Sequence, residues 1–111
     1  MKIKWLGHSS FLLEESTGTS IVTDPYEGDY VGIPYPKVRA DIVTVSHPHH
    51  DHNAARLVEG SPRVIDGVGF WEIDGVYVNT LESCHDHHGG LRRGKNLICK
   101  FRLDGVEVVH M

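Results

Sequence analysis

One short segment constrains the fold of this chain more than any other, because it leads from an apolar strand directly into a set of metal ligands. Residues 40–45, Ala-Asp-Ile-Val-Thr-Val, form a β-branched run typical of a buried strand. Residues 46–53, Ser-His-Pro-His-His-Asp-His-Asn, follow at once and contain the pattern H-x-H-x-D-H. Because α/β folds place their chemistry in loops at strand ends, this segment predicts a sheet with a functional loop at its edge.

The candidate ligands in this pattern are His47, His49, Asp51 and His52. Pro48 disfavours helix at the preceding residue, and in extended backbone residues two apart project to the same side. The imidazoles of His47 and His49 can therefore converge on one ion, whereas Asp51 and His52 can reach a second ion nearby. The spacing predicts a site for two metal ions. The alternative is a histidine-rich tract that binds metal incidentally.

A second cluster, Cys-His-Asp-His-His-Gly-Gly, supplies the next candidate ligand. We expect His85 to join His47 and His49 in a three-histidine site whose remaining position holds water. His87 and His88 are expected to lie outside the ligand set or to face solvent.

The composition excludes several classes of function. At 111 residues the chain supports one domain, and with a net charge of −4 it lacks the clustered Lys and Arg that a nucleic-acid surface needs. No apolar run approaches the roughly 20 residues of a membrane span, and the N-terminus lacks a signal-peptide core. We expect a cytoplasmic protein that binds neither nucleic acid nor membrane. Cys84 and Cys99 are expected to be small buried hydrophobic residues.

Short strands are expected along most of the chain. They are residues 3–6, 10–14, 20–23, 40–45, 63–65, 69–73, 76–81, 97–102 and 106–109. Asp74-Gly75 and Asp104-Gly105 are strong hairpin signals between neighbouring strands.

Helices are expected to be few. Residues 51–59 have the composition of a short helix that Gly60 would end. Residues 26–36 form a loop rich in Gly, Pro and Tyr. The sequence therefore predicts one mostly β domain over residues 1–111, with one or two helices.

Several marks along the chain carry a resemblance to a known family. They are Gly7-His8-Ser9-Ser10, Thr23-Asp24-Pro25, the H-x-H-x-D-H pattern, His85-Asp86 followed by Arg93-Gly94-Lys95-Asn96, and the Asp104-Gly105 hairpin. On these marks, which extend over almost the whole chain, the protein resembles the metallo-β-lactamase fold hydrolases. Within them it is similar to the branch of ascorbate-phosphate lactonase-like and related bacterial and archaeal proteins. The resemblance implies an α/β fold, namely the N-terminal half of an αβ/βα sandwich.

The resemblance also implies a two-metal site, usually with zinc, with manganese or iron as alternatives. His47, His49 and His85 would bind one ion. Asp51 and His52 would bind the other, together with a bridging carboxylate and a further histidine from the C-terminal half. A hydroxide between the ions would attack the substrate, because the metals lower the pKa of bound water. Asp51 would orient this nucleophile and assist proton transfer.

Two residues outside the histidine clusters have weaker predicted roles. Asp24 is expected either to accept a hydrogen bond from a ligand imidazole or to form a simple Asp-Pro turn. His8 is expected either to line the site or to cap its turn. The loop of residues 26–36, with its three tyrosines, is expected to set substrate specificity.

A complete fold of this family runs to about twice this length, and its bridging Asp follows the segment equivalent to residues 106–111. We therefore expect a half-sandwich that leaves the inner face of its sheet uncovered and needs a partner. The partner would be the complementing C-terminal half as another chain, or a second copy in a homo-oligomer. Contact would involve the strand edge at residues 106–111.

Two functions stay open from the sequence. The first is a metal-dependent hydrolase of an ester-like bond in a small molecule, such as a phosphodiester, lactone or thioester, that is inactive or partner-dependent as this chain alone. The second is a non-catalytic metal-binding module, in which His47, His49 and His85 bind one ion and the second site stays incomplete.

Overall fold

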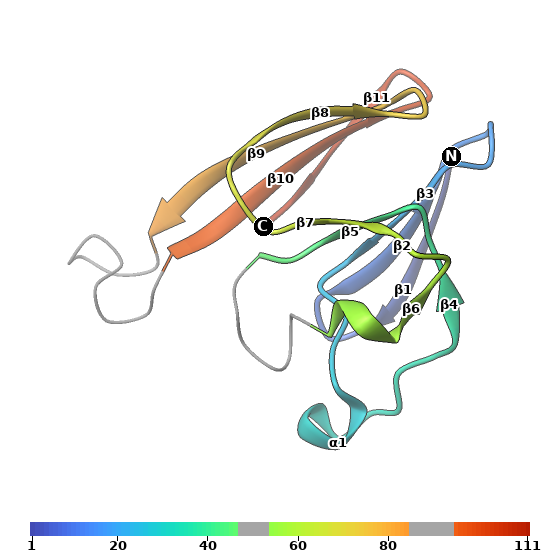
Figure 1. Cartoon of the computed structure of the whole chain (residues 1–111), viewed down its shortest axis with the longest axis vertical. Coiled ribbons are helices and arrows are strands. Elements are labelled where there is room, and N and C mark those ends of the chain that lie inside the picture. Colours follow the sequence, from blue (N-terminus) through green and yellow to red (C-terminus); the bar gives the residue numbers. More distant parts are fainter. Residues whose placement is uncertain (47–53, 85–94) are drawn as a thin grey trace.

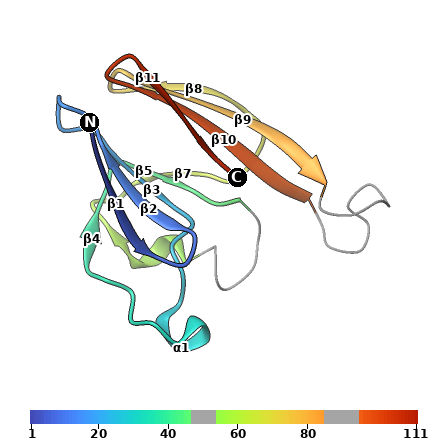
Figure 2. The same cartoon turned by 180° about the vertical axis from the view of Figure 1, so that it is seen from behind.

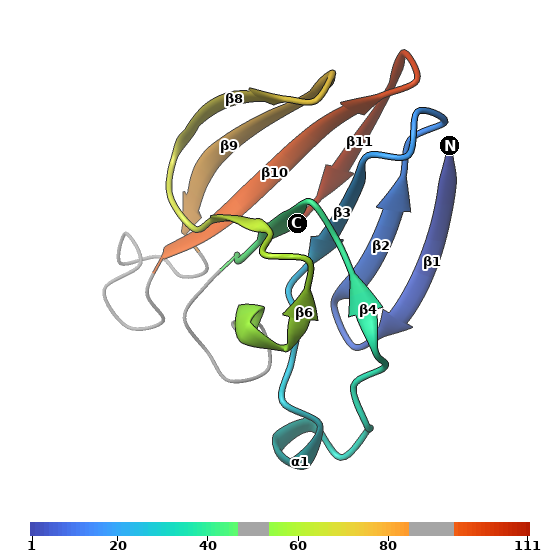
Figure 3. The same cartoon turned by 45° about the vertical axis from the view of Figure 1, so that its right-hand side comes forward.

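The computed structural model describes residues 1–46, 54–84 and 95–111, which form a sandwich of two facing β-sheets (Figure 1). The first sheet has the order β1 (Lys2–Gly7), β2 (Ser10–Glu14), β3 (Ser20–Thr23), β5 (Ile42–Thr44) and β7 (Arg63–Ile65). The second has the order β11 (Val106–His110), β10 (Lys95–Leu103), β9 (Val76–Cys84) and β8 (Gly69–Ile73). A small pair, β4 (Val38–Arg39) and β6 (Val58–Glu59), packs on the outer side of the first sheet (Figure 3).

The strand directions in the first sheet bring the ends of two strands together. β1, β2 and β3 pair antiparallel, whereas β3, β5 and β7 pair parallel. Because β3 and β5 run the same way with Thr23 opposite Thr44, the chain leaves both strands at the same edge of the sheet. Residues 24–25 and residues 45–46 therefore lie next to each other.

The central strands of the first sheet, β3 and β5, are buried on both faces, which explains why Ile21, Val22, Ile42 and Val43 are all apolar. One face packs against the second sheet, and the buried residues between the two layers are Leu13, Ile21, Ile42, Ile65, Val76, Val78, Leu97, Cys99, Phe101 and Leu103. The other face is covered by β4, β6 and neighbouring loops, and its buried residues are Leu6, Val22, Val38, Ala40, Val43, Val45 and Val58. Along β3, Ile21 faces one cluster and Val22 the other.

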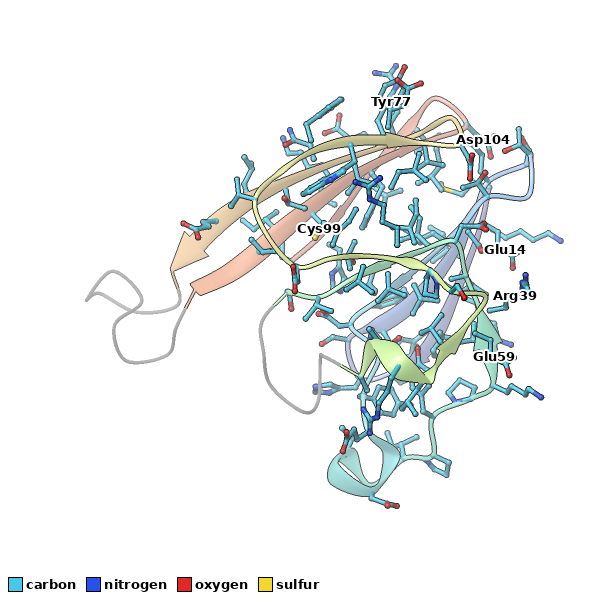
Figure 4. All side chains as sticks on the ribbon, in the orientation of Figure 1. Glu14, Arg39, Glu59, Tyr77, Cys99 and Asp104 are labelled. Carbon is cyan, nitrogen blue, oxygen red and sulfur yellow. The ribbon has the colours of Figure 1, made fainter. Side chains whose placement is uncertain are left out.

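The prediction of an uncovered inner face is wrong, because strands β8 to β11 cover it. The surface without a cover among the described residues is instead the outer face of the second sheet (Figure 2). Phe70 is 64% exposed on this face, and its ring lies 6.0 Å from that of Tyr77. Tyr77 points away from the sandwich, whereas Cys99 lies between the sheets (Figure 4).

The predicted strands are all present, with small shifts at their ends. The hairpin signals are confirmed as well. Asp74 and Gly75 have φ values of 47° and 84°, and Asp104 and Gly105 have 50° and 73°. Two successive left-handed residues are what a two-residue hairpin turn requires, and Asp-Gly adopts them at low cost.

The predicted helix over residues 51–59 is wrong in its described part. Ala55–Leu57 form a single turn of 3-10 helix, and Val58–Glu59 form β6 instead. Val58 pairs with Val38 and is buried against the first sheet, so tertiary burial overrides the local helical composition. The loop at residues 26–36 contains the one-turn helix α1 (Gly28–Val31), which Gly32 ends in a left-handed conformation. Among the described residues, no helix is long and apolar enough to cross a membrane.

Candidate metal centre

Thr23, the last residue of β3, and the next two residues, Asp24 and Pro25, hydrogen-bond to the segments around the candidate metal loop. The Thr23 hydroxyl donates to the Ser9 carbonyl, at 3.1 Å, and accepts from the Phe11 amide, at 3.0 Å. Asp24 and Pro25 bind the two ends of the loop. The end of β3 is therefore the structural centre of the site.

Asp24 fixes the start of the candidate metal loop. Its Oδ1 accepts from the Ser46 amide at 2.7 Å, and its Oδ2 accepts from the Ser46 hydroxyl at 2.6 Å. Both residues are buried, and the Asp24 amide donates to the Thr44 carbonyl at 2.8 Å. Because Ser46 directly precedes His47, the carboxylate sets the position from which the ligand pattern begins. Asp24 therefore does more than form an Asp-Pro turn.

Pro25 fixes the other end of the same loop. Its carbonyl accepts from the amide of Ala54, at 2.7 Å, and Ala54 is fully buried. The two ends of the segment between Ser46 and Ala54 are thus attached to adjacent residues, Asp24 and Pro25. These hydrogen bonds hold the two ends of the loop, Ser46 and Ala54, close to each other.

The hairpin of β9 and β10 is attached to the same point. The Leu97 amide in β10 donates to the Ser46 carbonyl at 2.8 Å, and Lys95 pairs with Cys84 at the open end of the hairpin. In Figure 1 this end lies on the same side of the sandwich as the end of β5. Ser46 therefore joins the end of β5, which leads into the first histidine cluster, to β10, which follows the second.

The predicted ligands themselves lie outside the described residues. These are His47, His49, Asp51, His52 and His85, together with His87 and His88. The imidazole predicted to bind Asp24 belongs to the same segments. Their roles stay predictions. Within residues 1–46, 54–84 and 95–111, no group of three or more His, Cys, Asp and Glu side chains could hold a metal ion.

His8 lies in the turn between β1 and β2 with an exposed ring. Its φ is 50°, its carbonyl accepts from the Trp5 indole at 2.9 Å, and its ring meets Tyr26 edge-on at 6.3 Å. The left-handed backbone of His8 thus helps to form the turn. The His8 side chain is exposed and lies beside Tyr26. Tyr26 is two residues from Asp24 in the sequence.

Tyr26 and Tyr35, from the loop predicted to set specificity, support the site from within. Tyr26 is fully buried and donates to the Leu6 carbonyl at 2.9 Å. The Tyr35 hydroxyl lies 2.9 Å from the Ser10 hydroxyl, and burial raises the pKa of Tyr35 to about 12. Their rings pack edge to face at 4.7 Å. A buried aromatic ring with a bonded polar tip stabilises a core, which is the role of Tyr26. Tyr35 is half-buried and also lines a cavity with Glu27 and Arg56, so the predicted role of this loop in specificity stays a prediction.

Cys99 is a small buried residue, as predicted from the sequence. Burial raises the pKa of its thiol to about 11, and the Asp24 carboxylate raises it further in the same direction, while the Thr44 hydroxyl opposes both. Burial and the nearby carboxylate therefore favour the neutral form of the thiol. The side chain of Cys84 lies outside the described residues.

Gly7 offers a direct test of how the β1–β2 turn packs on Tyr26. Its φ is +117°, and a Cβ there would lie 2.3 Å from the Tyr26 hydroxyl oxygen. We expect Gly7→Ala to lower the free energy of unfolding by about 2–4 kcal/mol, from backbone strain plus overpacking. Chemical denaturation measures the loss.

The matched control is Gly18→Ala, where φ is +100° but a Cβ would meet nothing within 4 Å. It isolates the backbone strain. Combining Gly7→Ala with Tyr26→Phe should recover part of the loss, because the hydroxyl that clashes is removed. Equal losses in the two glycine variants would show that Tyr26 does not pack on this turn.

Comparisons with known proteins agree with this architecture. A family model described as a beta-lactamase superfamily domain matches residues 2–111. A UPF0173 metal-dependent hydrolase of Pelotomaculum thermopropionicum is 46% identical over 97% of this chain and 44% of its own length. A second protein of that description, from Thermococcus kodakarensis, is 27% identical over 99% of this chain and 60% of its own length.

Solved structures show the same fold. A Thermotoga maritima protein described as a Zn-dependent hydrolase of the metallo-β-lactamase superfamily is 42% identical, with a TM-score of 0.76 over 97% of this chain and 47% of its own. A Parabacteroides distasonis protein superposes with a TM-score of 0.72 at 19% identity, a likeness of fold alone. The chain spans about half the length of the relatives it matches. By the match along residues 2–111, it belongs to the beta-lactamase superfamily domain family.

Proposed function

We propose that this chain forms the metal-binding half of a metal-dependent hydrolase that cleaves an ester-like bond in a small molecule. The observation that carries the proposal is the closed base of the candidate metal loop, whose ends are bound by the adjacent residues Asp24 and Pro25. A loop that contains H-x-H-x-D-H and is held so tightly suits a preorganised set of ligands. The relatives described as metal-dependent or Zn-dependent hydrolases support the same conclusion.

The donor set fits zinc, because imidazole and carboxylate groups are its usual ligands in catalytic sites. His47, His49 and His85 would hold one ion, and Asp51 and His52 would contribute to a second. Manganese and iron accept similar donors. When bound, such ions act as Lewis acids toward water and substrate. Asp51 would also orient the attacking water and take up its proton.

The burial of Asp24 and Ser46 supports the proposal that the adjacent loop binds metal. A buried carboxylate is costly unless it is well hydrogen-bonded, and Asp24 uses both oxygens to fix one residue. Partners that orient a ligand segment in this way commonly tune metal affinity. Asp24 therefore acts on the metal loop through Ser46, in addition to any bond with an imidazole.

Metal analysis separates the two functions that the sequence leaves open. When the remainder of the fold is supplied, the hydrolase predicts about two zinc equivalents per chain and cleavage of bis-p-nitrophenyl phosphate, whereas a non-catalytic module predicts one equivalent without turnover. We expect His49→Ala to lose at least one equivalent, while His88→Ala, outside the predicted ligand set, should retain the wild-type count. Inductively coupled plasma mass spectrometry after dialysis measures the stoichiometry. A purified chain that binds no zinc, manganese or iron would contradict the proposal.

We further propose that complete activity needs a partner that supplies the remainder of the fold. About half of each relative's length has no counterpart in this chain. In addition, β1 and β11 are edge strands of their sheets, and a cavity of about 160 Å³ lies between them. Exposed apolar side chains lie on these two edge strands and at the last residue, namely Ile3, Trp5, Val106, Val109 and Met111, and of these Ile3 and Val109 line the cavity. Either the complementing C-terminal half or a second copy of this chain could add to these edges.

Light scattering on the purified chain tests the need for a partner. We expect self-association at micromolar concentration, because an apolar opening of this kind is rarely left in water. A variant with charges on both edges, Trp5→Lys combined with Val109→Lys, should shift the population toward monomer. A well-folded wild-type monomer at that concentration would contradict the proposal.

A further inference from the structure

His110 lies at the end of β11 with a hydrogen bond that is unusual for an edge strand. Its Nε2 lies 3.0 Å from the carbonyl oxygen of Ser9, in the turn between β1 and β2. A carbonyl oxygen can only accept, so Nε2 carries the proton. The ring also meets Phe11 edge-on at 6.0 Å. Nδ1 is buried and has no hydrogen-bond partner among the described residues.

The Ser9 carbonyl is the point where this histidine reaches the candidate metal centre. It accepts a second hydrogen bond, from the Thr23 hydroxyl at 3.1 Å, and that hydroxyl in turn accepts from the Phe11 amide. Thr23 directly precedes Asp24. One carbonyl oxygen therefore connects β11 of the second sheet to the end of β3 in the first.

The turn that His110 contacts is packed against the base of the site. Gly7 lies against the Tyr26 hydroxyl, His8 lies against the Tyr26 ring, and Ser10 bonds to Tyr35. The two residues before Tyr26, Asp24 and Pro25, bind the two ends of the metal loop. A shift of the turn would therefore move the segment that holds this loop.

We propose that His110 is a positioning residue of the candidate metal centre, acting through its hydrogen bond to the Ser9 carbonyl. This inference rests on the proposed function, because the loop it positions is the candidate metal loop. His110 touches no substrate or metal in this role. The bond keeps the β1–β2 turn seated on Thr23, and Thr23 in turn keeps Asp24 aimed at Ser46.

Two variants of His110 separate its hydrogen bond from its packing. His110→Gln keeps a donor within reach of Ser9 but removes the ring, whereas His110→Phe keeps a ring against Phe11 but removes the donor. Val109→Thr, an exposed change on the same strand, is the matched control. If packing alone mattered, the phenylalanine variant would resemble the wild type and the glutamine variant would be worse.

The first measurement needs no metal. Hydrogen exchange of the Phe11 amide, which donates to Thr23, should be about tenfold faster in His110→Phe and close to wild type in His110→Gln. The second measurement is Co²⁺ affinity by competition with a chromophoric chelator. We expect a loss of about tenfold in His110→Phe, at the lower end of what outer partners of ligands contribute, and less than about threefold in His110→Gln.

The outcomes distinguish this inference from the proposed function. If the wild type binds Co²⁺ but neither variant changes exchange or affinity, or if His110→Gln is affected more than His110→Phe, His110 is not a positioning residue. If the wild type binds no Co²⁺, the proposed function fails. The exchange rates then still decide whether His110 seats the turn on Thr23.

Discussion

The buried hydrogen bonds between Asp24 and Ser46 are the interaction on which the remaining structure depends. Asp24 binds both the amide and the hydroxyl of Ser46, and the Ser46 carbonyl binds Leu97 in the opposite sheet. One residue thus connects the ends of β3 and β5 with the strand that follows the second histidine cluster. Burying a carboxylate without hydrogen-bond partners costs free energy, so the two hydrogen bonds from Ser46 stabilise Asp24 in this position.

The two sheets of the sandwich differ in how many of their faces are covered, and this difference explains where apolar side chains are exposed. The central strands β3 and β5 of the first sheet carry apolar side chains on both faces because each face is covered there, by the second sheet on one side and by β4, β6 and loops on the other. The second sheet is covered on its inner face only. Its outer face and its edge strand β11 carry exposed apolar side chains such as Phe70 and Val109.

The sequence predicted features that depend on neighbouring residues. Strands followed from apolar alternation, and the two Asp-Gly hairpins followed from their need for left-handed backbone. The helix over residues 51–59 failed because Val58 pairs with Val38, a contact that local composition does not contain. Ser46 and His110 were missed for the same reason, since their partners Asp24 and Ser9 are distant in the chain. The ligand pattern stays a prediction, made from the short spacings at which metal ligands cluster.

We infer that the hydrogen bonds from Ser46 to Asp24 position the candidate metal loop. The most direct test is zinc affinity of Ser46→Ala, by competition with a chromophoric chelator, beside Ser20→Ala. Ser20 lies at the opposite end of β3, and its hydroxyl also bonds to an aspartate, Asp41. The claim predicts that Ser46→Ala binds zinc about 10- to 100-fold more weakly than the wild type, while Ser20→Ala is unchanged. A folded Ser46→Ala variant with wild-type affinity would contradict it.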